Sequence, residues 1–336
     1  MSRFYAAAIV AVALLTSRPS VCGGEAATLS WLRGLPVYDH VVIVVEENKD
    51  YEEIIGNRRA SYINDVLRTE GATFTKMYGE EHNSQGNYFW LFSGSNQSVG
   101  FADDIPTAEN NPNFPFTASN LGQQLILSGR TFKGYAESLP EIGFDRPFSD
   151  DHLYARKHAP WISFKNVPNG STASTSSNLR FVDFPAEFRQ LPTVAFVIPN
   201  LDNDMHNGNP QERVPIGDAW LKKNLNSYYQ WAKQNNSLLI LTFDESNDRG
   251  HFRGLTTPLE DTPQNQQHRD VQNRIATIFA GASIKPGEYS EGKGITHVNI
   301  LRTLEAMYGL PKSGAQQPNA VGAGISDDFI ITDVFQ

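Results

Sequence analysis

The sequence is poor in cysteine and in positive charge, and both shortages limit what kind of protein it encodes. Only one of the 336 residues, Cys22, is a cysteine, and the formal net charge is −9. One cysteine cannot build an intramolecular disulfide framework. A general nucleic-acid binder needs a basic face, so the negative balance argues against nucleic acid as a partner. Hydrophobic residues make up 40% of the chain, which is enough for a substantial core.

Long apolar segments are missing beyond the first residues. Arg3 precedes an apolar run from Phe4 to Leu15, and small residues follow that run. This pattern is typical of a secretory signal peptide, predicted here over residues 1–26, with an uncleaved anchor helix as the alternative. A spanning helix needs about 20 apolar residues. We therefore expect no stable membrane insertion and a secreted or periplasmic protein with a single domain, residues 27–336.

Strand and helix patterns alternate along the rest of the chain. Runs rich in β-branched and aliphatic residues predict buried strands at 40–46, 72–77, 131–135, 194–198, 237–243 and 274–280. Apolar residues at helical spacing predict helices at 61–70, 88–92, 120–128, 217–234 and 297–308. The alternation predicts an α/β fold with a mostly parallel sheet and helices on both of its faces.

Polar side chains that suit metal binding follow three of the predicted strands. They are Glu47 and Asn48, then Asp202, Asp204 and His206, and finally Asp244 and Glu245. The carboxyl ends of parallel strands share one edge of a sheet, where ligands bind, so these groups can converge. Carboxylates with an imidazole suit a hard or borderline divalent cation, or a phosphate held by the imidazole. For the loop after residue 198, a calcium-like structural loop or a plain polar turn is the alternative.

A serine lies just before a predicted helix. Ser84 precedes the apolar run 88–92, and Gly94 ends that run. Unpaired N–H groups and the dipole at a helix start favour an anion. Ser84 is therefore either a nucleophile activated by a metal or a plain N-cap. Together, Ser84 and the acidic strand ends are typical of metal-assisted phosphoryl transfer. In such a reaction a histidine holds the phosphate or protonates the leaving group.

A basic turn is a further candidate for phosphate contact. Arg156, Lys157 and His158 follow one another in the chain. The alternative for this turn is a solvated surface segment.

Six sequence blocks carry a resemblance to a known family. They are Val44–Asn48, His82–Tyr88, Tyr154–Trp161, Ile198–Gly208, Leu241–Glu245 and His297–Glu305. In this order they make the chain resemble the bacterial secreted acid phosphatases of the phosphoesterase family, which includes phospholipases C and belongs to the alkaline phosphatase superfamily. Among these phosphatases it most resembles the group that includes phosphatidylinositol-3-phosphatases.

The resemblance implies an alkaline phosphatase-like fold, a divalent metal ion as cofactor, and Ser84 as a nucleophile that forms a phosphoserine. The metal ligands that it implies or suggests are Glu47, Asn48, Ser84, Asp244, Glu245, Asp202, Asp204 and His297. The further catalytic candidates are His206 and His158. Two possibilities stay open for the block from 202 to 206, which are a second metal site and hydrogen bonds to the phosphate.

The chain departs from the family pattern beside the nucleophile. Relatives commonly have proline where this sequence has Asn83 and Gly86. Both prolines stiffen the loop, so their absence leaves the loop geometry as a point for the structure to decide.

Three functions fit these observations to different degrees. The first is a phosphomonoesterase acting on a phosphoinositide or another small phosphate ester. The second is a phosphodiesterase of the phospholipase C type, and the third is a non-catalytic secreted binding protein. The chain has no obvious added lipid-binding domain, which favours the first over the second. The gathered acidic residues count against the third, because like charges without a cation repel one another.

Overall fold

A computed structural model describes residues 35–82, 84–99, 104–247 and 273–336. The predicted signal peptide, residues 1–26, and Asn83 lie outside the described residues. Among the residues that are described, no helix is both long enough and apolar enough to cross a membrane.

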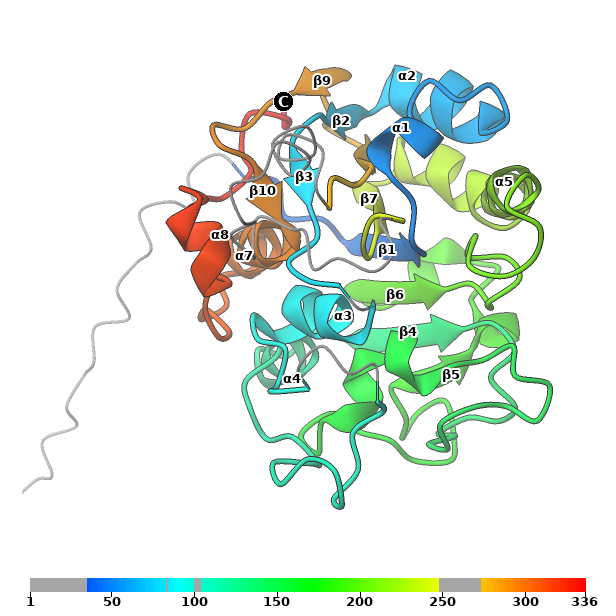
Figure 1. Ribbon diagram of the computed structural model, residues 1–336, viewed down its shortest axis with the longest axis vertical. Coiled ribbons are helices and arrows are strands. Elements are labelled where there is room, and N and C mark those ends of the chain that lie inside the picture. The colour runs from blue at the N-terminus through cyan, green and yellow to red at the C-terminus, as the bar shows by residue number, and fades with distance from the viewer. Residues whose placement is uncertain (1–34, 83, 100–103, 248–272) are drawn as a thin grey trace, which may run out of the picture. The chain divides into compact units, whose positions relative to one another are not determined.

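An eight-stranded sheet forms the centre of the described fold (Figure 1). Its strands, in spatial order, are β5 (Asn178–Arg180), β4 (Phe132–Ala136), β6 (Val194–Ile198), β1 (His40–Glu46), β7 (Ser237–Phe243), β8 (Thr277–Gly281), β2 (Ala72–Phe74) and β9 (Gly287–Tyr289). A second, two-stranded sheet pairs β10 (Ile295–Thr296) with β3 (Met77–Tyr78).

The first five strands of this order are parallel, and they place three acidic strand ends at one edge. β1 pairs in parallel with β6 on one side and with β7 on the other. Residues 41–45 of β1 are all buried, as expected for a run of β-branched residues covered on both faces. Because β6, β1 and β7 are neighbours in register, the polar residues that follow each of them come close together.

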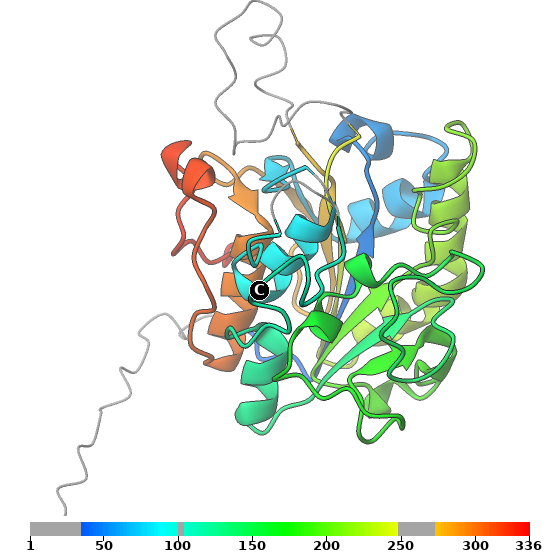
Figure 2. The same ribbon diagram turned by 60° about the horizontal axis from the view of Figure 1, so that its bottom comes forward.

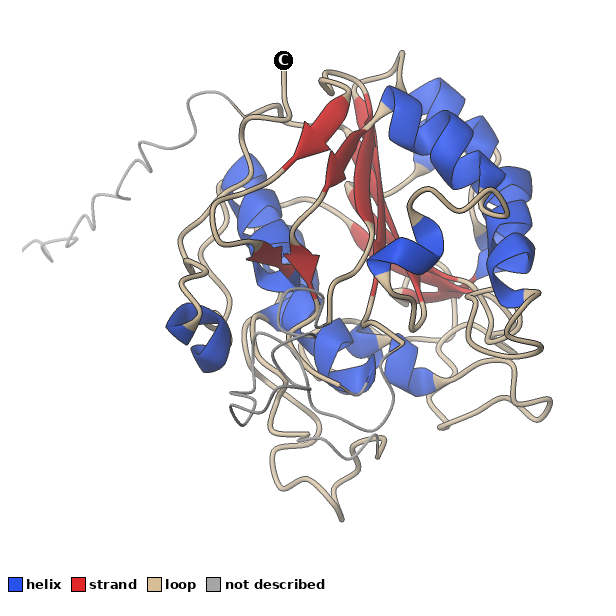
Figure 3. Ribbon diagram, turned by 45° about the horizontal axis from the view of Figure 1, so that its top comes forward, coloured by secondary structure: helices blue, strands red, loops and turns tan. Residues whose placement is uncertain are grey.

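Helices cover both faces of the sheet (Figures 2 and 3). The α-helices are α1 (Tyr51–Ile54), α2 (Arg68–Glu70), α3 (Ser84–Ser93), α4 (Leu121–Leu127), α5 (Arg213–Ala232), α7 (His297–Tyr308) and α8 (Pro318–Gly322). The other helical turns are the π-helix η2 (Ile63–Leu67) and the 3₁₀ turns η3 (Arg156–His158), η4 (Pro160–Ser163), η5 (Phe181–Asp183) and η6 (Phe188–Gln190). In Figure 2, α3 and α7 lie on one side of the strands and α5 on the other. The predicted α/β class, with a mostly parallel sheet and helices on both faces, is confirmed.

Three local differences from the sequence-based expectation have physical reasons. No strand was predicted at β5, but its three residues become a strand because β4 offers them a parallel edge. β8 runs antiparallel to both β7 and β2, which a hydrophobic pattern cannot indicate. The segment predicted as a helix at 61–70 contains a π-helical stretch, and Asp218 of α5 accepts the N–H groups of Tyr62 and Ile63 at its start.

Candidate active site

Backbone contacts join the three acidic strand ends. The N–H of Glu47 donates to the backbone oxygen of Asp204 over 2.8 Å, which fixes the loop after β6 against the end of β1. On the other side, the N–H of Asn48 donates to Oδ1 of Asp244 over 2.9 Å. Asn48 has a φ of +49°, a left-handed conformation that asparagine tolerates and that turns the chain sharply at this point. We call Glu47, Asn48, Asp204, Asp244 and Glu245 the strand-end cluster.

Ser84 lies beside this cluster as the first residue of α3. Its side chain is buried, and its Oγ lies 3.0 Å from Oε2 of Glu47 and 3.3 Å from Oε1 of Glu245. The hydroxyl can donate to either carboxylate, so a base is within reach of the proton that a nucleophilic serine must lose. The structure thus brings Ser84 together with Glu47 and Glu245, which follow β1 and β7 and are far from Ser84 in sequence.

A second set of contacts extends from Glu47 towards η3. Nε2 of His158 lies 3.3 Å from Oε1 of Glu47, and Nδ1 of His158 lies 3.8 Å from Oδ2 of Asp204. Ligand atoms of these three residues all lie within 4.8 Å of one another, as a metal ion would require. Tyr88, one helical turn after Ser84, stacks on the His158 ring and donates its hydroxyl to Glu47.

Burial shapes the electrostatics of the strand-end cluster. Burial raises the pKa of Glu47 well above its ordinary value, and the nearby charges of Asp244 and Asp204 raise it further. Burial also raises the pKa of Asp204 well above its ordinary value and raises that of Asp244. The pKa of His158 is lowered well below its usual range by burial and by Lys157. The protein alone therefore does not neutralise this group of carboxylates, and a bound cation reverses such a field.

Buried oxygen atoms test whether a cation fits here. Oδ1 of Asn48, Oδ2 of Asp204 and Oδ2 of Asp244 are buried and form no hydrogen bond within the described part of the chain. Buried polar atoms are rarely left without a partner. Carboxylate and amide oxygens with one imidazole are a donor set suited to a divalent metal ion. The residues present thus fit the metal ion that the sequence predicted, and its identity is open.

The loop after β6 divides its predicted residues between the cluster and the rim. Asp204 is fully buried, and its Oδ1 accepts the N–H of His206 over 2.8 Å. His206 is half-buried, and its Nδ1 lies 3.1 Å from Oδ1 of Asn207. Asp202 is exposed and accepts a hydrogen bond from the Asn207 side chain. The structure therefore does not bring Asp202 into the cluster, because its side chain stays on the solvent side of the loop.

His297 is near the cluster, yet both ring nitrogens already have partners. Its Nδ1 lies 2.6 Å from Oε2 of Glu80, and its Nε2 lies 2.8 Å from the backbone oxygen of Phe243. Burial lowers the pKa of His297, but Glu80 outweighs this effect, so that the pKa is raised. His297 thus forms hydrogen bonds behind the end of β7, and its role as a metal ligand stays a prediction.

The residues of the basic turn 156–158 also divide between the site and other parts of the structure. Arg156 is buried, and its two terminal nitrogens donate to the backbone oxygens of Asp145 and Pro106 over 2.7 Å each. Arg156 thus fastens surface loops. His158 contacts the strand-end cluster, and the charge of Lys157 partly offsets the raised pKa values of Glu47 and Asp204.

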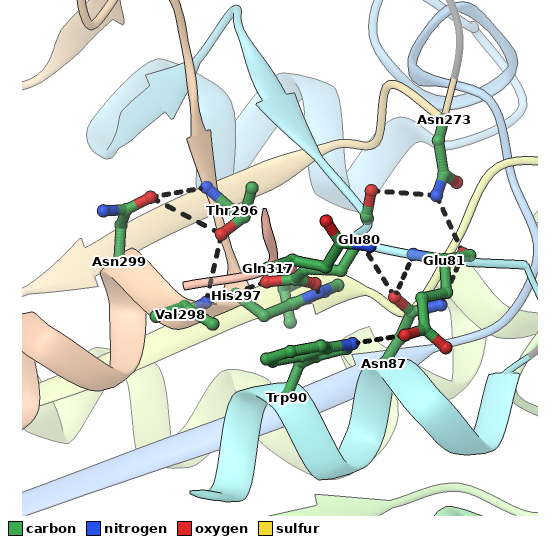
Figure 4. A network of polar contacts seen from close by, with 12 residues as sticks. Glu80, Glu81, Asn87, Trp90, Asn273, Thr296, His297, Val298, Asn299 and Gln317 are labelled. Atoms are coloured by element: carbon green, nitrogen blue, oxygen red, sulfur yellow. Dashed lines mark hydrogen bonds and ion pairs between the residues drawn. The ribbon is translucent and has the colours of Figure 1, made fainter. Parts of the chain in front are cut away.

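Several supporting residues were not assigned roles from the sequence. Nδ1 of His82 lies 2.7 Å from Oε2 of Glu245. The position of His82 in the same sequence block as Ser84 could have indicated that it belongs to the site. The spacing of four residues from Ser84 likewise indicates that Tyr88 faces the same way on α3. Figure 4 shows a network beside the segment that precedes Ser84, in which Asn87 accepts the N–H groups of Glu80 and Glu81. No local sequence pattern reveals this network.

Glu81 explains one of the missing prolines. Its Oε1 accepts hydrogen bonds from Trp90 Nε1 over 2.8 Å and from Asn96 Nδ2 over 2.6 Å. Burial raises the pKa of Glu81 to about 7. A Cβ on Gly86 would lie 2.5 Å from Oε2 of the same carboxylate. Glycine at 86 leaves room for this carboxylate, whose hydrogen bonds tie the segment before Ser84 to the second half of α3 and to Asn96 beyond it.

Comparison with known proteins agrees with this geometry. The phosphoesterase family matches residues 61–311. The phosphatidylinositol-3-phosphatase of Mycobacterium tuberculosis is 42% identical over 282 residues, which are 83% of this chain and 80% of that protein. A probable acid phosphatase of Kluyveromyces lactis is 29% identical over 83% of this chain and 60% of its own length.

A solved structure supports the fold independently. A protein of the alkaline phosphatase superfamily from Vibrio parahaemolyticus superposes with a TM-score of 0.50, covering 88% of this chain and 71% of that one. At 11% identity this likeness concerns the fold alone. The family match and the 42% identity extend over most of the chain, and both fit a buried serine beside gathered carboxylates. The chain belongs to the phosphoesterase family and is a hydrolase of phosphoric esters.

Proposed function

We propose that the protein is a secreted phosphomonoesterase of the acid phosphatase type, with Ser84 as its nucleophile. The observation that carries the proposal is the position of Ser84 Oγ, at the start of α3 and within 3.3 Å of carboxylates of Glu47 and Glu245. A helix start favours the phosphate group that the serine would attack. The signal peptide predicted over residues 1–26 supports secretion.

A divalent metal ion belongs to this proposal. Glu47, Asn48, Ser84, Asp244 and Glu245 would hold it. When bound, such an ion lowers the pKa of a hydroxyl and neutralises charge on phosphate oxygens. Asp204 and His158 would either hold a second ion beside Glu47 or hydrogen-bond the phosphate. Asp202 lies on the rim of the same loop and is not included in this set of proposed ligands.

The chain's own residues then divide the chemistry between them. Ser84 Oγ passes its proton to a neighbouring carboxylate and forms a bond to phosphorus, while the bond from phosphorus to the leaving oxygen breaks. His206 gives the leaving oxygen a proton. Water next loses a proton to His206 and bonds to phosphorus, while the bond from phosphorus to Ser84 Oγ breaks, the carboxyl group returns the proton to Oγ, and inorganic phosphate leaves. His82, which lies 2.7 Å from Glu245, holds that carboxylate towards the serine.

The substrate class follows from the relatives. One of them is named phosphatidylinositol-3-phosphatase and shares 42% identity with this chain, which supports a phosphoinositide among the substrates. Another is named a probable acid phosphatase, which supports small phosphate monoesters.

Replacing the nucleophile tests the proposal. Ser84→Ala should lower phosphate release from p-nitrophenyl phosphate at least about 10³-fold, because no other group takes over covalent attack. Ser93→Ala is the matched control: it lies at the other end of α3, is equally buried, and donates to the backbone oxygen of Phe89. That variant should keep turnover within about twofold of the wild type.

A chelator arm and a diester arm complete the test. EDTA should abolish activity, and a divalent ion should restore it. Bis-p-nitrophenyl phosphate should be cleaved more slowly than the monoester. Normal turnover by Ser84→Ala contradicts the nucleophile assignment, and faster cleavage of the diester contradicts the monoesterase assignment.

A further inference from the structure

Asn273 lies behind the site in an unusual backbone conformation. It is fully buried, and its φ is +51°, in the left-handed region that asparagine adopts more readily than most residues. It directly precedes the segment that leads into β8. Neither the proposed chemistry nor the sequence patterns give it a role.

Both ends of the Asn273 amide are used, and they hold two different segments. Its Nδ2 donates to the backbone oxygen of Gly79 over 2.9 Å and to that of Glu81 over 2.8 Å. Its Oδ1 accepts the N–H of Ser246 over 2.9 Å. Its backbone oxygen accepts the N–H of Gly79 over 2.9 Å, so the Gly79 peptide is held from both sides. Figure 4 shows the amide directed at the Glu80–Glu81 segment.

The two segments that Asn273 joins carry opposite halves of the site. Glu81 is three residues before Ser84, whereas Ser246 directly follows Glu245. The packing between them is tight, because a Cβ on Gly79 would lie 2.8 Å both from Asn273 Nδ2 and from the backbone oxygen of Asp244. Any movement at this junction changes where Ser84 stands relative to Asp244 and Glu245.

We propose that Asn273 is a positioning residue, which fixes residues 79–81, just before Ser84, against the turn after β7 that carries Asp244 and Glu245. The proposal rests on the proposed function, since it concerns the alignment of Ser84 with Glu245. The distance of 3.3 Å between Ser84 Oγ and Glu245 Oε1 is the contact that this junction sets. The hydrogen bonds of the Asn273 side chain described above go to the backbone of Gly79, Glu81 and Ser246, so Asn273 acts through these segments. Displacements of about 1 Å in such an arrangement lower turnover about 10²-fold.

Two asparagine variants test this role. Asn273→Ala should lower kcat for p-nitrophenyl phosphate about 30-fold and change KM less than about threefold, since outer supports of this kind contribute 10- to 100-fold. Asn236→Ala is the control: Asn236 also has a positive φ, of +40°, and its side chain also donates to a backbone oxygen, that of Val37. It precedes β7 at the amino end of the strand, away from the site, so its kcat should stay within about twofold of the wild type.

Gly79→Ala tests the same junction from the loop side and leaves Asn273 unchanged. It should also lower kcat with little change in KM, and it carries the test if Asn273→Ala does not fold. A folded Asn273→Ala or Gly79→Ala with kcat within threefold of the wild type overturns the proposal. An equal loss in Asn236→Ala also overturns it, because backbone strain would then account for the effect.

Ser84→Ala, measured alongside, separates the two proposals. If Ser84→Ala is inactive while Asn273→Ala is fully active, the positioning role alone fails. If Ser84→Ala stays active, the nucleophile assignment fails, and the alignment of Ser84 with Glu245 loses its meaning for turnover.

Discussion

Two of the regions that bury ionisable side chains in the described part of this domain are stabilised in different ways. In α7, the Arg302 guanidinium lies 2.8 Å from carboxylate oxygens of both Glu305 and Asp327 and also donates to the backbone oxygen of Ser313. We call Arg302, Glu305 and Asp327 the α7 ion network. Its arginine contacts both carboxylates directly, whereas in the strand-end cluster the charges of Asp244 and Asp204 add to burial in raising the pKa of Glu47.

The difference separates a structural charge group from a functional one. Removing one partner of a satisfied buried pair costs stability. Removing one carboxylate from an unneutralised group relieves repulsion, and the loss falls on ligand binding and chemistry instead. The predictions below use this contrast, in order of decreasing effect.

The largest effect is expected at Asp244. Asp244→Asn should lower kcat about 10³-fold, equal to about 4 kcal/mol, because it removes an anionic oxygen from the proposed metal site. In EDTA its melting temperature should equal or exceed that of the wild type. The control is Asp218→Asn, since both oxygens of Asp218 accept backbone N–H groups. That variant should lose stability and keep kcat. The contrast breaks down if Asp244→Asn is the less stable of the two in EDTA.

The second effect concerns stability in the α7 ion network. Arg302→Leu should lower the free energy of unfolding by about 3 kcal/mol, because it leaves Glu305 buried without its cation. Urea unfolding measures this change, and kcat per folded molecule should stay near the wild-type value. The double variant Arg302→Leu/Glu305→Leu should recover part of the loss. A double variant less stable than Arg302→Leu would argue against uncompensated charge as the cause.

The smallest effect is a pH dependence at Glu305. Burial raises the pKa of Glu305 to about 7, and Arg302 opposes this shift. Because the native pKa lies above the unfolded value of about 4.3, the contribution of this group to stability is fully present below pH 4 and is lost as the pH rises through 7. Between pH 6 and pH 8 the loss amounts to about 1 kcal/mol.

Glu305→Gln isolates that contribution, because glutamine keeps the size and one acceptor oxygen but does not titrate. Between pH 6 and pH 8, the free energy of unfolding should fall by about 1 kcal/mol more in the wild type than in the variant. Identical slopes would show that Glu305 keeps an ordinary pKa in the native state.

Local patterns were sufficient to predict the main features of the fold and several members of the site. The buried runs at 40–46, 194–198 and 237–243 became β1, β6 and β7. Their parallel order then brought together the acidic residues that follow each strand. Ser84 begins a helix because an apolar run follows it at the distance of one turn. These features depend on periodicity and on strand polarity, which a sequence displays directly.

Contacts between distant residues could not be predicted in this way. His297 resembles a ligand by its position in a block, but its partner Glu80 lies 217 residues away and takes up one ring nitrogen. Asn273 and Gly79 are 194 residues apart, and an amide hydrogen bond leaves no periodic trace in a sequence. Asp202 was grouped with Asp204 by proximity in the chain, yet the turn after β6 directs only Asp204 inwards.

Gly86 and Glu81 have a consequence for how this loop can evolve. A side chain at 86 and a carboxylate at 81 compete for the same volume, since a Cβ on Gly86 would lie 2.5 Å from Oε2 of Glu81. A homologue with proline at position 86 must therefore place the side chain of residue 81 elsewhere or carry a smaller one. Of the two single exchanges, a side chain at 86 in the presence of Glu81 meets this close contact, whereas a smaller residue at 81 opposite Gly86 does not.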